Sequence, residues 1–149
     1  MRNKILAVLL MMLFAAPCFA QTIGSVNYRE LLSNYSKAKA AMSELEDRAN
    51  EMQRFLLDKE KEFKKIDSAV QRKTFEDQTA RTLAQKQDAL DKYRLKKETE
   101  IDAAIDAAIK QVAMENKIDT VVDSRVIFYG AVDITDKVLK RLNFAPAAK

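Results

Sequence analysis

Few residues in this sequence could do chemistry, and their types exclude most catalytic and metal-binding sites. The 149 residues hold no His and one Cys, so a Ser-His-Asp triad, a Cys-His pair and a His- or Cys-ligated zinc site are all excluded. Two Gly are too few for glycine-rich phosphate loops. Acidic pairs such as Glu60 and Glu62 lie among lysines on an expected exposed helix, without a pocket that could prepare them for acid–base catalysis. We therefore expect no enzyme, no metal site and no cofactor.

The first twenty residues are typical of a secretory signal peptide. Two basic residues precede an apolar run at 5–16, and small residues stand at Cys18 and Ala20, which predicts cleavage after Ala20. The run is shorter than the roughly 20 residues of a membrane-spanning helix. A retained membrane anchor and a lipoprotein acylated at Cys18 are the alternatives. The remaining residues, 21–149, contain no cysteine, and their formal charge is +2, since two of the 26 basic residues lie in the leader, against 22 acidic ones.

Residues 36–117 are expected to form a long helical hairpin, which we call the arm. They contain no Gly and no Pro and are rich in helix-forming residues. Apolar residues recur at spacings of four and three from Ala38 to Ile66, which predicts a coiled-coil seam. The eight apolar seam positions are Ala38, Met42, Leu45, Ala49, Met52, Leu56, Phe63 and Ile66, and Lys59 is the exception.

The pattern breaks at Asp67, where Ser68 and Gln71 form a capping-box sequence that predicts a second helix from Ala69. The tip of the hairpin could equally lie at Thr74. In the second helix the apolar positions between residues 101 and 112 form a wide stripe, as expected of a helix that enters a larger core.

The distal part of the arm is basic. Residues 54–97 carry a net charge of +5, whereas the rest of residues 21–149 carries −3. These charges either solvate an exposed coiled coil or form a basic tip that attracts an anionic membrane surface or an acidic client. The predicted basic tip consists of Lys61, Lys64, Lys65, Arg72, Lys73 and Arg81.

The segments that flank the arm, 21–35 and 118–143, are expected to form a small β-containing base, followed by a tail at 144–149. A strand at 22–26 leads to a short helix capped by Asn27. The β-branched runs 120–122 and 126–129 are expected to pair as a hairpin. Asp133 can cap a last helix over 134–142, and we expect Tyr28 and Tyr129 to pack in the base.

The fold class is therefore α+β and mostly α, with an antiparallel coiled-coil arm on a small base. About 45 residues make a marginal independent core, and the strands would expose unpaired edges. Pairing of these edges between subunits would solve both problems, so we expect an obligate oligomer.

This order of elements resembles the Skp/OmpH family of periplasmic chaperones. The local matches are 23–27, 117–123, 126–129 and 133–139, and the resemblance covers the whole chain after the leader. It implies a homotrimer whose bases form a small intersubunit β-barrel, with three arms enclosing a cavity. Unfolded outer-membrane β-barrel proteins would be held there after export without ATP. The residues implied at the trimer interface are Ile23, Val26, Val121, Val122, Ile127 and Phe128.

A chaperone without ATP must bind its clients weakly at many apolar points, and methionine suits such variable surfaces because it is flexible and polarisable. The candidate client contacts in the arm are Met42, Met52, Phe55, Leu57 and Phe75. Phe55 and Leu57 lie beside the predicted seam, so they either join a wider core or face the cavity. A structural coiled-coil adaptor of the envelope is the main alternative function. Export and the near balance of charges argue against nucleic acid as a partner.

Overall fold

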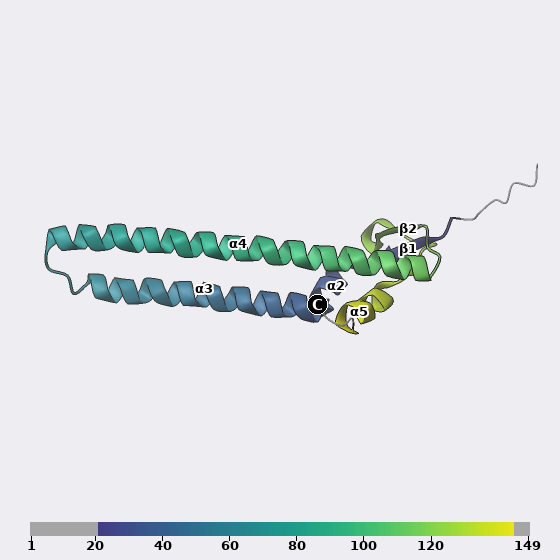
Figure 1. Ribbon diagram of the computed structural model, residues 1–149, viewed down its shortest axis with the longest axis horizontal. Coiled ribbons are helices and arrows are strands. Elements are labelled where there is room, and N and C mark those ends of the chain that lie inside the picture. The colour runs from purple at the N-terminus through teal and green to yellow at the C-terminus, as the bar shows by residue number, and fades with distance from the viewer. Residues whose placement is uncertain (1–20, 145–149) are drawn as a thin grey trace, which may run out of the picture.

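The computed structural model describes residues 21–144, which form a long helical hairpin with a small mixed base at one end (Figure 1). The predicted signal peptide and residues 145–149 of the predicted tail lie outside this part of the chain. The elements follow in the order β1 (Ile23–Val26), α2 (Tyr28–Asn34), α3 (Ser36–Phe63), α4 (Ala69–Glu115), β2 (Thr120–Asp123), a 3-10 turn η1 (Ser124–Val126), β3 (Val132–Asp133) and α5 (Thr135–Phe144).

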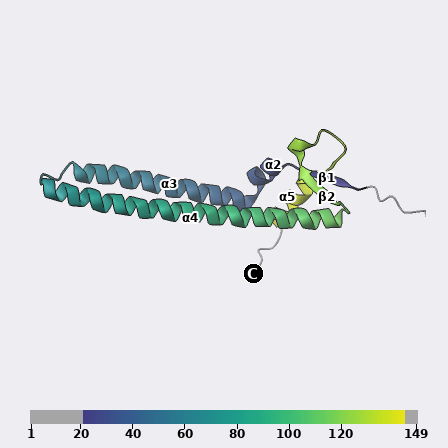
Figure 2. The ribbon, with the colours of Figure 1, turned by 90° about the horizontal axis from the view of Figure 1, so that it is seen from above.

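Helices α3 and α4 run side by side and antiparallel over the length of α3, as both views show (Figures 1 and 2). Helix α4 has 47 residues and α3 has 28, so that the last third of α4 extends beyond α3 into the base. Residues 64–68 turn the chain, which places the tip at the predicted break. Ser68 precedes α4 as predicted, but its side chain makes no capping hydrogen bond, so the capping-box interpretation is wrong in that detail. Within residues 21–144, no helix is both long and apolar enough to cross a membrane.

The seam between α3 and α4 follows the predicted heptad at Ala38, Leu45, Met52, Lys59 and Phe63, which are half-buried, but departs from it by one residue at positions between these. Ala41 is buried and Phe55 half-buried, whereas their neighbours Met42 and Leu56 are 74% and 43% exposed. The two heptad phases share the positions seven residues apart, such as Leu45. They differ at the positions between, where the predicted phase has Met42 and Leu56 and the shifted phase has Ala41 and Phe55. The shifted phase includes an exposed cation between Ala41 and Phe55, which hid this phase in the sequence.

That cation is Arg48, whose guanidinium carbon lies 4.2 Å from the centre of the Tyr93 ring on α4. Farther along the seam, the Lys59 and Lys86 ammonium groups lie 5.8 and 5.4 Å from the centre of the Phe55 ring. Cation–π contacts of this kind let a basic residue occupy a position that would otherwise require an apolar one. The middle of the arm is therefore held by aromatic–cation stacking as well as by aliphatic packing.

The base contains a three-stranded parallel sheet in the order β2-β1-β3. The predicted hairpin of 120–122 with 126–129 is wrong, because both β2 and β3 pair with β1. Asp123 accepts hydrogen bonds from the backbone N–H and guanidinium of Arg125, and these bonds close a 3-10 turn where the second hairpin strand was expected to begin. Gly24 permits close packing in β1, since a Cβ there would lie 3.0 Å from Ile118 Cγ2.

The core lies where α2, α5 and the last third of α4 meet. Its largest fully buried side chains are Leu31 of α2, Ile105 of α4, Ile134, and Val138 of α5. Ile105, Ala108 and Val112 are all buried, which confirms the predicted wide stripe. The strongest anchor of the arm is thus the continuation of α4 through the base.

Side chains cap the two short helices of the base. Asn27 accepts a hydrogen bond from the Glu30 backbone N–H at 3.2 Å, which confirms the predicted cap of α2. Asp133 accepts hydrogen bonds from the backbone N–H and the hydroxyl of Thr135, at 2.8 and 2.6 Å. Helix α5 extends to Phe144, two residues beyond its predicted end and into the predicted tail.

Ile105→Ala should lower the free energy of unfolding by about 3 kcal/mol, because Ile105 is fully buried and truncation leaves a cavity. Leu95→Ala on the same helix removes an exposed side chain and should cost less than about 0.5 kcal/mol. Urea unfolding followed by circular dichroism at one protein concentration measures both. Equal effects of the two substitutions would contradict this account of the core.

Candidate binding surfaces of the arm and base

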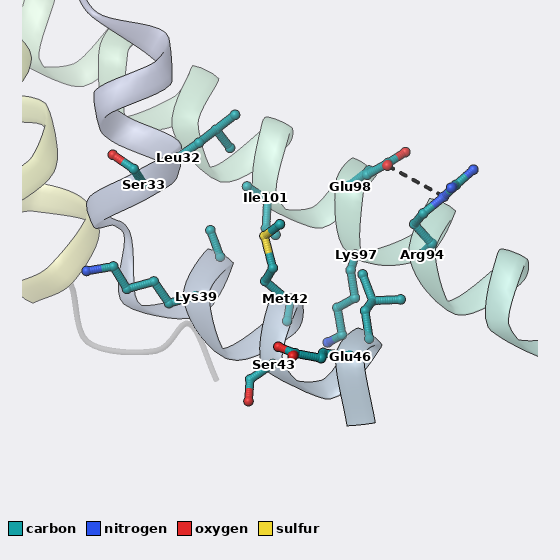
Figure 3. Close-up of a pocket in the computed structure, with 13 residues that line it drawn as sticks. Leu32, Ser33, Lys39, Met42, Ser43, Glu46, Arg94, Lys97, Glu98 and Ile101 are labelled. Carbon is teal, nitrogen blue, oxygen red and sulfur yellow. Dashed lines mark ion pairs between the residues drawn. The ribbon is translucent and has the colours of Figure 1, made fainter. Parts of the chain in front are cut away.

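A groove of about 900 Å³ opens where α2, α3 and α4 meet, and we call it the root groove (Figure 3). Its apolar lining comes from Leu32, Ala38, Ala41, Met42, Leu45 and Ile101. Figure 3 shows Met42 near the centre, with its sulfur pointing toward Ile101. The groove is thus an open, mostly aliphatic depression with a flexible thioether at its middle.

Charged side chains line the rest of the root groove, and several of them have partners. Arg94 and Glu98 form an ion pair at 3.8 Å, and the Lys97 ammonium lies 3.2 Å from Glu100. Both ion pairs join residues of α4, so they do not cross the groove. An apolar side chain can therefore enter without burying an unpaired charge at these positions.

The geometry of the root groove depends on how α2 is held against α4. The hydroxyl of Tyr28 on α2 donates a hydrogen bond to the Asp102 carboxylate on α4. Burial of the ring, this hydrogen bond and the nearby negative charges of Asp102 and Asp106 raise the pKa of Tyr28 to about 12. At the corner between α2 and α3, Asn143 of α5 accepts hydrogen bonds from the backbone N–H and hydroxyl of Ser36, at 2.9 and 2.8 Å. Helix α2, which forms one wall of the root groove, is thereby held to α4 at its start and to α5 at the corner that follows it.

A second groove, of about 370 Å³, lies near the tip and opens on the same side of the hairpin. Leu56 and Phe63 of α3 and Phe75 of α4 contribute its apolar lining, and the Phe63 and Phe75 rings lie 6.2 Å apart. Leu56 follows Met42 by two heptads, over which a helix face drifts by only about 40°. One side of the arm therefore carries two apolar grooves, and we call it the grooved face.

An apolar loop projects from the base between β2 and β3. Val126, Phe128 and Tyr129 are exposed, and with Ile23 and Gly130 they line a shallow pocket of about 320 Å³. Figure 2 shows this loop standing away from α4 beside the sheet. An apolar loop next to open strand edges is typical of a surface that another chain covers.

The region that matches a known family includes both the arm and the base. Residues 22–142 match the family described as Outer membrane protein (OmpH-like). The chain belongs to the OmpH-like family. No curated protein matches the chain. The predicted family is thus confirmed, and membership indicates a chaperone-type function in outer membrane protein biogenesis, in a family that is periplasmic and not enzymatic.

The predicted client contacts lie in two environments, the grooved or exposed surface of the arm and the half-buried seam. Met42 lines the root groove, Phe75 lines the groove near the tip, and Leu57 is exposed. Met52 is half-buried and shares a small pocket with Arg48 and Lys86, while Phe55 is half-buried in the seam. Leu32 and Leu56 also line the grooves, and sequence reasoning missed them because one lies in the base and the other was assigned to the seam.

The predicted basic tip residues do not converge on one site. Lys61 and Lys64 form ion pairs with Asp58 and Glu60 at 3.3 and 2.6 Å. Arg72 donates to the Ile66 carbonyl and lies over the Phe63 ring. The exposed cations Lys65, Lys73 and Arg81 lie on different turns of the distal arm. The tip also presents Val70, which is largely exposed and was not predicted as a surface feature.

The residues predicted at the trimer interface differ in how far they are buried within their own chain. Val26 is buried within its own chain, Val121, Val122 and Ile127 are half-buried, and Ile23 and Phe128 are exposed. Tyr28 packs against the core as predicted, but Tyr129 is almost fully exposed, so its predicted packing is wrong. The loop that carries Tyr129 leaves the sheet instead of pairing as a hairpin strand. Among residues 21–144, His, Cys, Asp and Glu side chains form no group of three that could hold a metal ion.

Asp102→Ala should lower the pKa of Tyr28 from about 12 toward 10.0, because it removes a hydrogen-bond acceptor and a negative charge. Because burial and the Asp102 contact together raise the pKa, the stability that neutral Tyr28 contributes is fully present below pH 10 and is lost as the pH rises through about 12. NMR titration of the Tyr28 ring measures the shift, and Asp106→Asn, which removes only the weaker charge effect, should lower the pKa less. An unchanged Tyr28 pKa in Asp102→Ala would contradict the assignment.

Proposed function

We propose that the protein is an ATP-independent periplasmic holdase that binds unfolded outer-membrane β-barrel proteins after export and prevents their aggregation. The observation that carries the proposal is the root groove, an open apolar depression with Met42 at its centre. Family membership supports a chaperone role, and the predicted signal peptide with cleavage after Ala20 supports export. Binding without ATP requires contacts that are individually weak, and open grooves supply such contacts.

The grooved face is suited to an extended chain that lacks a fixed structure. Two apolar grooves separated by two heptads can each take a side chain from one unfolded polypeptide. The opposite side of the arm has a smaller pocket at the same level, where Lys37, Glu44 and Glu100 line it beside Tyr35 and alanines, so that its lining is more charged than that of the root groove. We assign the client-binding role to the grooved face, with Met42 and Phe75 as contacts among the predicted residues.

The protein is also proposed to act as a homotrimer. Three short parallel strands leave edges unpaired within one chain, and the loop with Phe128 and Tyr129 exposes aromatic area beside those edges. Burial of this loop against a second copy would remove apolar surface from water and satisfy the strand edges. Ile23 and Phe128 are the predicted interface residues best placed for direct contact.

The oligomer prediction is tested by light scattering on the protein without its leader. We expect three subunit masses for the wild type, and Phe128→Asp should shift the population toward monomer because it places a charge in an apolar interface. Lys140→Asp, at an exposed position of α5, is the control and should leave the mass unchanged. A monomeric wild type, or a Phe128→Asp trimer of wild-type stability, would refute this interface.

The holdase prediction is tested with one urea-unfolded β-barrel outer-membrane protein. The wild type should keep the client soluble in a complex, and Met42→Asp should weaken the complex roughly tenfold because it replaces apolar lining by a charge. Met114→Asp is the matched control, since Met114 is 71% exposed on the same protein but lies outside the grooves. A wild type that leaves the client to aggregate would favour the structural adaptor instead.

A further inference from the structure

Three methionines lie in the described part of the chain, and their surroundings differ in a way that matters for oxidation. Met42 and Met114 are 74% and 71% exposed, whereas Met52 is half-buried in the seam. Exposure governs how readily a thioether meets a small oxidant in water. Met42 and Met114 should therefore react at similar rates, and Met52 should react more slowly.

Only one of the two exposed thioethers lies in a candidate binding surface. The Met42 sulfur sits at the centre of the root groove and points toward Ile101 (Figure 3). Met114 lies near the end of α4 and lines none of the four grooves and pockets described along the arm. The chain thus provides a reactive site inside the groove and an equally exposed comparison site outside it.

We propose that Met42 is an oxidation site at which a peroxide reversibly switches off apolar binding in the root groove. The inference rests on the proposed client-binding function of that groove. A lone pair on Met42 Sδ attacks one oxygen of hydrogen peroxide, the O–O bond breaks and an S–O bond forms. The departing hydroxide takes the hydroxyl proton and leaves as water. The sulfur loses two electrons, the peroxide gains them, and the product is methionine sulfoxide.

The consequence follows from the position of the new oxygen. A sulfoxide is polar and accepts hydrogen bonds, and at the middle of an aliphatic groove it would have to be desolvated whenever an apolar side chain enters. The groove would still be open, but its central contact would no longer favour apolar ligands. Reduction of the sulfoxide by a methionine sulfoxide reductase restores the thioether, so the change is reversible.

The test compares wild type, Met42→Leu and Met114→Leu, each before and after treatment with hydrogen peroxide, and mass spectrometry of peptides identifies the oxidised residues. Oxidised wild type and oxidised Met114→Leu should bind the unfolded β-barrel client roughly tenfold more weakly than the reduced proteins. Oxidised Met42→Leu should bind as tightly as reduced Met42→Leu, whatever that affinity is, because leucine has no sulfur to oxidise. Incubation with the reductase should restore the oxidised wild type.

A second readout separates failure of this inference from failure of the proposed function. Fluorescence of anilinonaphthalene sulfonate reports apolar surface without any client, and oxidation should lower it in the wild type but not in Met42→Leu. If the reduced wild type does not protect the client, the holdase function fails, and an unchanged dye signal would then also overturn the oxidation site. If the reduced protein protects, equal losses in oxidised wild type and oxidised Met42→Leu, or no loss in either, would overturn the role of Met42.

Discussion

The packing of the last third of α4 against α2 and α5 is the interaction on which the rest of the structure depends. A two-helix hairpin buries too little surface to fix its own position, and the base is too small to form a large core without it. Continuing α4 through the base places Ile105 among Leu31, Ile134 and Val138. The same helix then serves as a wall of the core and as half of the arm, so the arm is rigidly directed where it leaves the base (Figure 1).

The arm has more apolar residues than its seam can bury, and this excess is the basis of the proposed binding function. Two helices share only a narrow strip, so one of the two neighbouring heptad phases must stay outside. The phase that faces α4 at Ala41 and Phe55 also contains Arg48, which is exposed and stacks on Tyr93, while Met42 and Leu56 of the other phase face solvent. In a globular protein such residues would pack into a third layer. In this arm they remain exposed.

The base has unpaired backbone groups, because its three-stranded sheet leaves both outer strands with an open edge. Strand β1 is paired on both sides, but β2 and β3 each have a free edge. The loop between them adds exposed Phe128 and Tyr129 at the same end of the molecule. Unpaired strand edges and aromatic surface lie in the base and the apolar grooves lie in the arm, so the proposed self-association and the proposed client binding would use separate parts of the molecule.

The sequence by itself determined the features that depend on near neighbours. The absence of Gly and Pro predicted the hairpin, the break at Asp67 was one of two candidate positions for its tip, and Asn27 predicted the start of α2. The family could also be recognised, because its local sequence patterns occur in this chain in the expected order. These features follow from backbone propensity and side-chain capping within a few residues.

Only the tertiary structure decided which of the two heptad phases is buried and how the strands pair. Ala41 and Met42 are both apolar and adjacent, and the choice between them depends on what α4 presents opposite, including Tyr93 as a partner for Arg48. Likewise, Ile23 pairs with Thr120, 97 positions along the chain, whereas the sequence favoured a local hairpin. Contacts between distant segments compete with local preference, and the burial of a shared core decides between them.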